Sequence, residues 1–203
     1  MRHGATEWNR LKRAQGQADI ELTDLGRQQA EETAKELANY PIDAVYASDL
    51  RRAVDTARAI AEEHELEVTV EPAFREIDQG EWTGLTVDEI KVRWPELWGD
   101  NRHYHPRPGG ESPEQVLKRA LQGLARVVES HSHGTIVVVS HGGTIRWLSA
   151  AALGYDFRTS ARIRGLYNGD AVSVEAKLSN GQLVLTDFSR LDRKSPDRDD
   201  PNT

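Results

Sequence analysis

The sequence predicts an α/β fold with a largely parallel sheet, because short β-branched runs alternate with longer amphipathic stretches. The clearest β-branched run extends from Thr135 to Val139 and leads into two glycines, as a buried strand does when a helix follows it. The length of 203 residues suits one domain that buries most of its apolar surface.

The amino-terminal part of the chain contains two predicted helices and two predicted strands. In order, they are a helix over residues 24–39 with Thr23 as N-cap and Pro41 at its end, a strand over 44–47, a helix from Ser48 as N-cap to about residue 63, and a strand over 67–70. The side chains expected on the buried face of the first helix are Leu25, Ala30, Ala34, Leu37 and Ala38.

The carboxy-terminal part ends in a predicted hairpin, because Asn180-Gly181 separates two alternating runs. The expected elements are a loop over 72–84, a helix over 86–93, an irregular stretch over 94–111, a helix over 113–130 with a capping box from Ser112 to Gln115, a strand over 135–139, a helix over 143–153, and strands over 170–178 and 182–188. Residues 189–203 are charged and contain proline, which predicts a disordered tail after a single domain over residues 1–188.

Composition excludes several classes of protein and of site. The formal charge of −7 argues against a nucleic-acid binder. Because cysteine is absent, disulfides, thiolate nucleophiles and cysteine-ligated metals are excluded, and a cytoplasmic location is expected. No apolar stretch reaches the length of a membrane span, so no membrane partner is expected. The 20 arginines and 6 lysines favour planar recognition of phosphate.

Two histidine motifs at opposite ends of the chain predict the chemistry. Arg2-His3-Gly4 places an imidazole beside a cation, and Ser140-His141-Gly142-Gly143 places another after a buried strand, where ligands bind in open α/β sheets. Two imidazoles and arginines around a phosphate favour phosphoryl transfer through a phosphohistidine. The alternative for His141 is a structural role in the core.

Arg52 and Glu76 are the further candidates. Arg52 falls in the first turn of a predicted helix, where a cation is unfavourable unless an anion is bound there. For Arg51 we prefer a solvated surface position. Glu76 lies in a loop rich in carboxylates and supplies the general acid that an alkoxide leaving group requires, with Asp78 and Glu81 as local competitors.

Five motifs together resemble, in order, those of the phosphoglycerate-mutase-like branch of the histidine phosphatase superfamily. The motifs are Arg2-His3-Gly4, Arg51-Arg52-Ala53, Arg75-Glu76, Pro108-Gly109-Gly110-Glu111-Ser112 and Ser140-His141-Gly142-Gly143. The resemblance covers residues 1 to about 175. It implies a three-layer α/β/α fold around a mostly parallel central sheet.

The resemblance also implies a role for each matched residue. His3 is the nucleophile, held by a hydrogen bond to the Gly4 carbonyl; Arg2, Arg52 and His141, the last in its charged form, hold the phosphate; and Glu76 exchanges protons with the leaving oxygen and the attacking water. Asn9, Gln15, Gly16 and Gly142 contact phosphate or substrate. No metal and no cofactor is expected. The pairs His103–His105 and His131–His133 lack further ligand residues nearby, so we do not interpret them as metal sites.

The segment between Glu76 and Ser112 favours a phosphatase over a mutase. Related cofactor-dependent mutases carry a long insertion there, whereas this chain has 35 intervening residues, as short broad-specificity phosphatases do. The expected partner is a small phosphorylated metabolite such as a phosphosugar or a phosphoglycerate-like acid. Residues 84–111 form the expected helical substrate lid, with Arg102 and His105 as substrate contacts, whereas Trp94 and Trp98 are expected in the core. A phosphoglycerate mutase and a non-catalytic binder of phosphate ligands stay open as alternatives, as does a homodimer.

The chain departs from this resemblance at its amino terminus. In the family an apolar strand precedes the Arg-His-Gly motif, but here only Met1 precedes Arg2. The first strand is therefore expected to be missing, which would expose sheet edges and leave His3 near a fraying end. A late-assigned start is the preferred explanation, over a trimmed sequence or a truncated, impaired protein.

Overall fold

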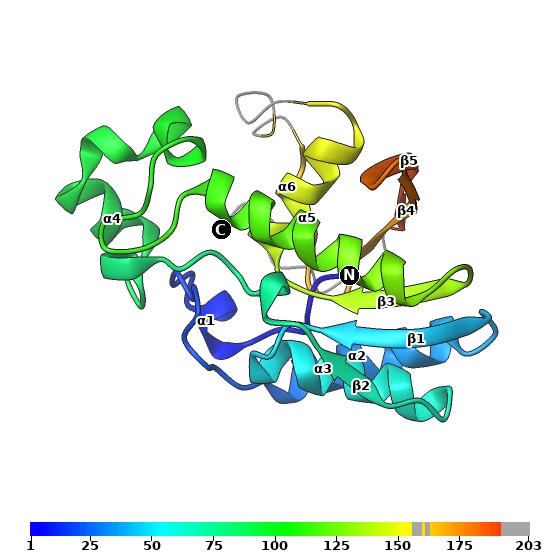
Figure 1. Cartoon of the computed structure of the whole chain (residues 1–203). Coiled ribbons are helices and arrows are strands. Elements are labelled where there is room, and N and C mark those ends of the chain that lie inside the picture. Colours follow the sequence, from blue (N-terminus) through cyan, green and yellow to red (C-terminus); the bar gives the residue numbers. More distant parts are fainter. Residues whose placement is uncertain (156–159, 161–162, 192–203) are drawn as a thin grey trace.

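The computed structural model describes residues 1–155, 160 and 163–191, and it has the predicted α/β architecture. Three parallel strands form the central sheet in the order β2-β1-β3, with β1 at Ile42–Ala47, β2 at Val68–Val70 and β3 at Thr135–Val139 (Figure 1). Each lies within two residues of its predicted position. Because parallel strands end at the same edge, the segments that follow β1 and β3 emerge side by side.

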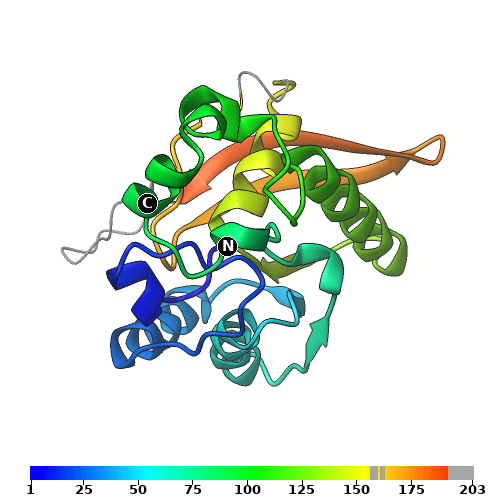
Figure 2. The ribbon, with the colours of Figure 1, turned by 90° about the vertical axis from the view of Figure 1, so that its left-hand side faces the viewer.

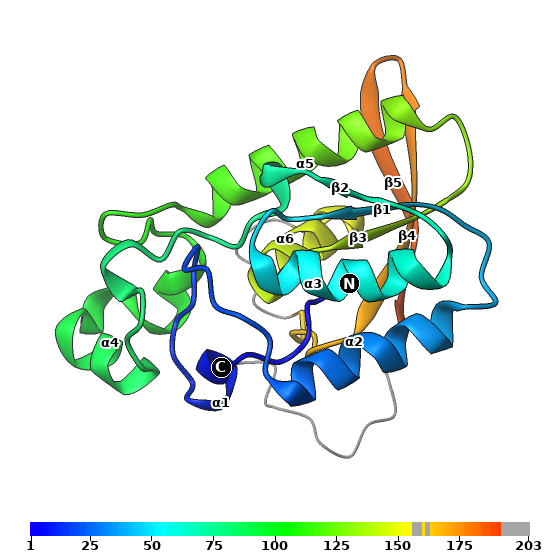
Figure 3. The same cartoon turned by 90° about the horizontal axis from the view of Figure 1, so that it is seen from below.

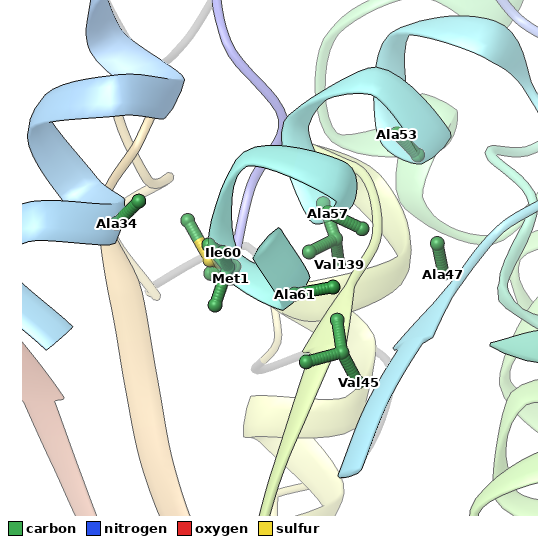
Figure 4. Packing of buried hydrophobic residues seen from close by; sticks show 9 residues of the cluster. All are labelled: Met1, Ala34, Val45, Ala47, Ala53, Ala57, Ile60, Ala61 and Val139. Atoms are coloured by element: carbon green, nitrogen blue, oxygen red, sulfur yellow. The ribbon is translucent and has the colours of Figure 1, made fainter. Parts of the chain in front are cut away.

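Helices cover both faces of this sheet. α2 (Asp24–Leu37) and α3 (Arg51–Glu63) lie on one face, and α5 (Pro113–Ser130) and α6 (Gly142–Ala152) lie on the other (Figures 1 and 3). The main core lies between α3 and the strands, as Figure 4 shows, and it consists of Met1, Ala34, Val45, Ala47, Ala53, Ala57, Ile60, Ala61 and Val139. Alanines dominate the α3 face, so the helix backbone can approach the sheet closely.

The first three residues act as a short strand beside β3. The Met1 nitrogen donates to the Val138 carbonyl at 2.6 Å, the Ser140 nitrogen donates to the Met1 carbonyl at 2.9 Å, and the His3 nitrogen donates to the Ser140 carbonyl at 3.1 Å. On the opposite side the Arg2 nitrogen donates to the Asp170 carbonyl at 2.9 Å. His3 is therefore hydrogen-bonded into the sheet region and does not lie at a frayed end, contrary to the expectation.

A two-stranded antiparallel hairpin follows, formed by β4 (Ala171–Ser179) and β5 (Gln182–Leu191). Its turn is the predicted Asn180-Gly181, where both residues have positive φ (51° and 75°). Because β5 continues to Leu191, the predicted tail is wrong for residues 189–191. The remainder of that predicted tail, 192–203, lies outside the described residues.

The predicted N-caps of α2 and α3 and the predicted buried face of α2 can be compared with the structure. Thr23 caps α2 as expected, its hydroxyl accepting from the Gly26 nitrogen at 3.1 Å. Ser48 does not cap α3: the N-cap is Leu50, and the Ser48 hydroxyl instead accepts from the Leu50 nitrogen at 3.3 Å in the turn before the helix. Leu25 is 41% exposed, since the buried face of α2 is formed by Gly26, Gln29, Ala30, Thr33 and Ala34.

Short helices complete the fold. Thr6 and Asn9 form a capping box on α1 (Glu7–Arg10), which the sequence analysis did not predict. Thr86 caps α4 (Val87–Arg93) at the predicted position. The 3-10 turns are η1 (Pro72–Phe74), η2 (Gly80–Trp82), η3 (Pro95–Leu97) and η4 (Gly99–His103). The predicted loop over 72–84 and the irregular stretch over 94–111 are thus built largely from single tight turns.

Two glycines allow the His3 segment to dock against the first turn of α2. A Cβ added to Gly4 would lie 2.3 Å from the Gly26 carbonyl oxygen, and one added to Gly26 would lie 2.1 Å from the Ala5 carbonyl oxygen. The backbones are therefore in direct contact, and neither position has room for a methyl group.

Gly26→Ala is expected to lower the free energy of unfolding by about 1–3 kcal/mol, because the new methyl group must displace backbone. Urea unfolding of the variant and the wild type measures this difference. The matched control is Glu31→Ala on the exposed face of the same helix, which should change stability by less than about 0.5 kcal/mol. Equal stability of the two variants would contradict the close docking.

Candidate active site

Most of the residues singled out in the sequence line one pocket, to which α1 and α4 also contribute side chains. Both helices lie on the left-hand side of the molecule in Figure 1, the side that faces the viewer in Figure 2. The predicted residues among those that line the pocket are Arg2, His3, Asn9, Gln15, Gly16, Arg52, Glu76, Arg102 and Gly142. His141 lies behind His3 and is fully buried, with the two ring centroids 5.1 Å apart. His105 is exposed and is not among the described residues that line the pocket.

His3 is held in one tautomer. Its Nδ1 lies 2.7 Å from the Gly4 carbonyl oxygen, which can only accept, so Nδ1 carries the proton. Its Nε2 accepts from Arg52 Nε at 3.3 Å and therefore presents a lone pair. Burial and the nearby Arg52 and Arg2 lower the pKa of His3 well below its usual value, so the ring is neutral at pH 7. A neutral imidazole whose Nε2 carries a lone pair instead of a proton is the form that can act as a nucleophile.

Arg52 is a fully buried cation, and its hydrogen-bond partners among the described residues are all neutral. Besides His3, it donates from Nη1 to the Ala18 carbonyl at 2.7 Å and from Nη2 to the Gly16 carbonyl at 2.7 Å. Burial lowers its pKa to about 10, which still leaves the guanidinium charged at neutral pH. Its position in the first turn of α3 adds the positive end of that helix, so an anion near His3 meets two sources of positive potential.

His141 is the N-cap of α6, and neither ring nitrogen has a hydrogen-bond partner among the described residues. Burial, followed by the charges of Arg52 and His3, lowers the pKa of His141 well below its usual value. These causes favour the neutral ring, whereas the charged form expected from the sequence serves to offset a bound phosphate. A phosphate dianion beside it would favour the protonated form.

Arg2 extends from the amino-terminal strand toward the start of α6. Its Nη1 donates to the Leu166 carbonyl at 2.5 Å, and its guanidinium lies beside Gly142, where an added Cβ would be 3.5 Å from Nε. Arg2 and Arg52 therefore approach the pocket from different sides of His3. An anion at His3 would meet both guanidinium groups.

Glu76 is the one of the three candidate carboxylates that lines the pocket. Its Oε2 accepts from the Gly143 nitrogen at 3.0 Å, and its Oε1 accepts from the Ile77 nitrogen at 2.9 Å. Asp78 instead caps the Gly80 nitrogen, and Glu81 is exposed. A Cβ at Gly143 would lie 2.5 Å from Glu76 Oε1, so a side chain there would displace this carboxylate.

Asn9 and Gln15 present donors to the pocket because their oxygens are already occupied. Asn9 Oδ1 accepts from the Thr6 nitrogen at 3.1 Å and from Asn168 Nδ2 at 3.3 Å, and Gln15 Oε1 accepts from the Thr6 hydroxyl at 2.9 Å. Their side-chain nitrogens, Nδ2 of Asn9 and Nε2 of Gln15, have no hydrogen-bond partner among the described residues. Asn168, which the sequence analysis missed, also donates to the His3 carbonyl at 2.9 Å.

An ion pair behind Glu76 fixes the loop that carries it, and the sequence analysis missed the cation of this pair. Arg119 of α5 contacts both Glu111 oxygens at 2.9 Å, and it donates to the carbonyls of Ala73, Arg75 and Glu76 at 2.7–2.9 Å. One oxygen of Glu111 also accepts from the Asp78 nitrogen at 2.9 Å. The main chain on both sides of Glu76 is thus anchored to α5. No sequence signal separated Arg119 from the other arginines on predicted helices.

Tryptophans form part of the wall of the pocket. Trp82 is 2% exposed and contacts Trp94 and Trp98, with ring centroids 6.3 and 5.8 Å apart. Trp94 and Trp98 are only partly buried, and Trp98 lines the pocket, so the expectation that both lie in the core is wrong. Arg102 stacks on Trp98, its guanidinium carbon 4.8 Å from the ring centroid. In the described part of the chain, no group of three or more histidines and carboxylates is positioned to hold a metal ion.

Comparisons with known proteins agree with the motifs. The model of the histidine phosphatase superfamily (branch 1) matches residues 1–188. Phosphoserine phosphatase 1 of Hydrogenobacter thermophilus is 39% identical over 77% of this chain and 75% of its own length. Glucosyl-3-phosphoglycerate phosphatase of Mycolicibacterium vanbaalenii is 36% identical over 86% of this chain and 81% of its own.

A solved structure shares the fold over nearly the whole chain. The vanadate complex of mycobacterial glucosyl-3-phosphoglycerate phosphatase has a TM-score of 0.83 at 32% identity, covering 91% of this chain and 93% of that one. Among the described residues, no helix has the length and apolar character needed to span a membrane.

The two neutral histidines predict how stability depends on pH. In the unfolded chain both protonate near the usual value of 6.5, whereas in the fold both stay neutral to lower pH. The unfolded state then binds more protons, so the free energy of unfolding should fall as pH drops from about 7.5 to 5.5.

Chemical unfolding across this range measures the effect. In His141→Gln the slope should be smaller, because one titrating group is removed, and inorganic phosphate should stabilise the wild type most at the acidic end. An identical slope in the variant would show that His141 does not titrate differently in the two states.

Proposed function

Because this chain belongs to the histidine phosphatase superfamily, we propose that it is a phosphatase that hydrolyses a small phosphorylated metabolite through a phosphohistidine, without a metal. The observation that carries the proposal is the hydrogen bond from His3 Nδ1 to Gly4, which leaves the Nε2 lone pair beside Arg52 in the pocket. Action in the cytoplasm is part of the proposal, supported by the absence of cysteine.

The first step transfers the phosphoryl group to His3. The Nε2 lone pair forms a bond to phosphorus as the bond to the ester oxygen breaks, and protonated Glu76 gives its proton to that oxygen. Arg2 and Arg52 stabilise charge on the transferring oxygens, together with the amide donors of Asn9 and Gln15. His141 takes a proton when the anion binds and adds a further positive charge.

The second step returns the phosphoryl group to water. The Glu76 carboxylate removes a proton from the attacking water while the bond from phosphorus to Nε2 breaks, which restores neutral His3 and protonated Glu76. Glu76 is suited to both steps because the main-chain nitrogens of Ile77 and Gly143 orient it toward the pocket. Residues 84–111, including Arg102, act as the substrate lid over a single domain that spans residues 1–188.

Hydrolysis is favoured over transfer to a second sugar acid. The relatives include proteins named for phosphatase activity on phosphoserine and on glucosyl-3-phosphoglycerate, as well as a phosphoglycerate mutase-like protein of Arabidopsis thaliana that is 37% identical over 93% of this chain and 87% of its own length. The short segment before Ser112 supports the phosphatase.

Rapid mixing with a labelled phosphomonoester, followed by an alkaline quench, should trap a phosphohistidine in the wild type and none in His3→Ala. Its decay in water should be as fast as turnover, because water is the acceptor. A phosphoenzyme that persists until a phosphoglycerate is added would indicate a mutase. Equal, negligible hydrolysis by wild type and His3→Ala would indicate a binding protein.

Glu76→Gln should affect substrates according to their leaving group. For an alkyl phosphate, whose alkoxide needs a proton, kcat/KM, which reports the steps up to departure of the leaving group, should fall about 10²–10⁴-fold. For p-nitrophenyl phosphate, whose phenolate leaves without one, the loss should be much smaller. Equal losses on both substrates would contradict the role of general acid.

Arg119→Lys should show the same leaving-group pattern at smaller amplitude, because it loosens the loop without removing the acid. The matched control is Arg126→Lys, also on α5, whose ion pair with Glu71 lies on the exposed side of the helix. The control should leave both substrates unaffected. A uniform loss in Arg119→Lys would assign that residue to stability alone.

A further inference from the structure

We propose that the pocket contains a second anion subsite centred on Arg107, so that the substrate is a phosphomonoester that carries a further carboxylate or phosphate group. The inference rests on the proposed phosphatase function and specifies the class of substrate. Arg107 has none of the catalytic roles described above.

Arg107 is buried in the wall of the pocket, with 7% of its surface exposed, and its partners are neutral. Its Nε donates to Gln79 Oε1 at 3.2 Å, and its Nη1 donates to the Arg102 carbonyl at 2.6 Å and to the His105 carbonyl at 3.4 Å. Its second amino group, Nη2, donates to no described residue. That group is the part of the side chain available to a ligand.

An aromatic ring completes the environment of Arg107. Its guanidinium carbon lies 4.6 Å from the centroid of the buried Trp82 ring. A cation over a ring face is attracted by the quadrupole of the ring and keeps its full charge. Trp82 and the neutral acceptors thus orient the guanidinium but do not neutralise it.

Other partly buried arginines near the site have carboxylate partners. Arg75 contacts both oxygens of Asp49, and Arg119 contacts both oxygens of Glu111. Arg107 has no carboxylate within ion-pair distance in the part of the chain that the structure describes. The charge of Arg107 is therefore not neutralised by a carboxylate, whereas the charges of Arg75 and Arg119 are.

Electrostatics in the pocket favours a ligand with more negative charge than one phosphate. Burial and, after it, the charge of Arg102 lower the pKa of Arg107 to about 10, while the charge of Glu76 acts in the opposite direction. Seven arginine and lysine side chains line the pocket among the described residues, against the single carboxylate of Glu76. Arg2 and Arg52 flank His3 and serve the transferred phosphate, which leaves Arg107 for another group.

The backbone holds Arg107 in a fixed relation to Glu76. The Glu81 nitrogen donates to the Pro108 carbonyl at 2.8 Å, and the Glu111 nitrogen donates to the Asp78 carbonyl at 3.0 Å. Gly80 permits this contact, since a Cβ there would lie 2.1 Å from the Pro108 carbonyl oxygen. The turn that carries Arg107 is thus fastened to the loop that carries Glu76, as a preorganised subsite requires.

An uncharged group of the substrate would cover the Arg107 guanidinium without supplying a negative charge. Enclosing a cation against an uncharged group removes its remaining hydration without a compensating partner. A carboxylate or a phosphate would instead accept from Nη2 in a charge-assisted hydrogen bond. Both anions share this chemistry, and the substrates of the test separate them.

The test compares substrate pairs that differ only in the second anion. The carboxylate pair is 3-phosphoglycerate and glycerol 3-phosphate, and the phosphate pair is fructose 1,6-bisphosphate and fructose 6-phosphate. In the wild type, kcat/KM should be at least about tenfold higher for the more anionic member of one pair, the expected effect of one charge-assisted hydrogen bond. The pair that shows the difference identifies the anion.

Arg107→Gln should remove this preference. It should lower kcat/KM for the more anionic substrate at least about tenfold, mainly through KM, and change the partner substrate less than about threefold. Arg107→Lys should retain part of the preference. The matched control is Arg126→Gln, an exposed position on α5 that does not line the pocket, which should leave both substrates unchanged.

Two failures are distinguishable. If the wild type hydrolyses no phosphomonoester at all, both the phosphatase function and the anion subsite are wrong. If the wild type is active but prefers neither anionic member, or if Arg107→Gln lowers all substrates equally, the subsite is wrong while the phosphatase stands. The wild-type comparison needs no variant, so a folding defect in Arg107→Gln does not prevent the test.

Discussion

The hydrogen bond between His3 Nδ1 and the Gly4 carbonyl is the constraint on which the rest of the site depends. It fixes the tautomer, so Nε2 can face the pocket only if the Gly4 peptide is held still. Gln29 Oε1 holds the Gly4–Ala5 peptide by accepting from the Ala5 nitrogen at 2.8 Å. The Thr56 hydroxyl fixes the preceding peptide by accepting from the Gly4 nitrogen at 3.0 Å, and the backbone of Gly26 packs against Gly4. The first turn of α2 and the turn of α3 that carries Thr56 therefore help to hold the nucleophile in place.

Positive charge is concentrated in one pocket of a protein whose net charge is −7. The fold achieves this by giving its arginines two kinds of environment. Arg75 and Arg119 are neutralised by carboxylates and serve to fix loops. Arg52 and Arg107 are held by carbonyls, a ring nitrogen, an amide and an aromatic face, so their charge stays directed at a ligand. Cations held by neutral groups need no rearrangement when an anion enters, which is the form of electrostatic preorganisation that favours phosphoryl transfer.

Elements with a strong local signal were predicted well. The capping box at Ser112, the β-branched run at 135–139 and the Asn180-Gly181 turn lie where the sequence analysis put them, because local backbone preferences determine each of them. Ser48 was misassigned because a hydroxyl can cap a turn as readily as a helix. Leu25 was misassigned because the α2 face is chosen by its contact with residues 4 and 5, which are distant in sequence. In the site, Arg119 and Asn168 carried no local signal that set them apart.

The sequence by itself determined the family, the order of the elements and which side chains were candidates for chemistry, because motifs and periodicity are local properties of the chain. Only the tertiary structure decided that Glu76 lines the pocket while Asp78 and Glu81 do not, that His141 is neutral without an anion, and that the first three residues are hydrogen-bonded between Ser140 and Asp170. Tertiary contacts also decided which arginines are neutralised. The physical reason is that burial and the distance between charges set these properties, and both arise from residues that meet only after the chain has folded.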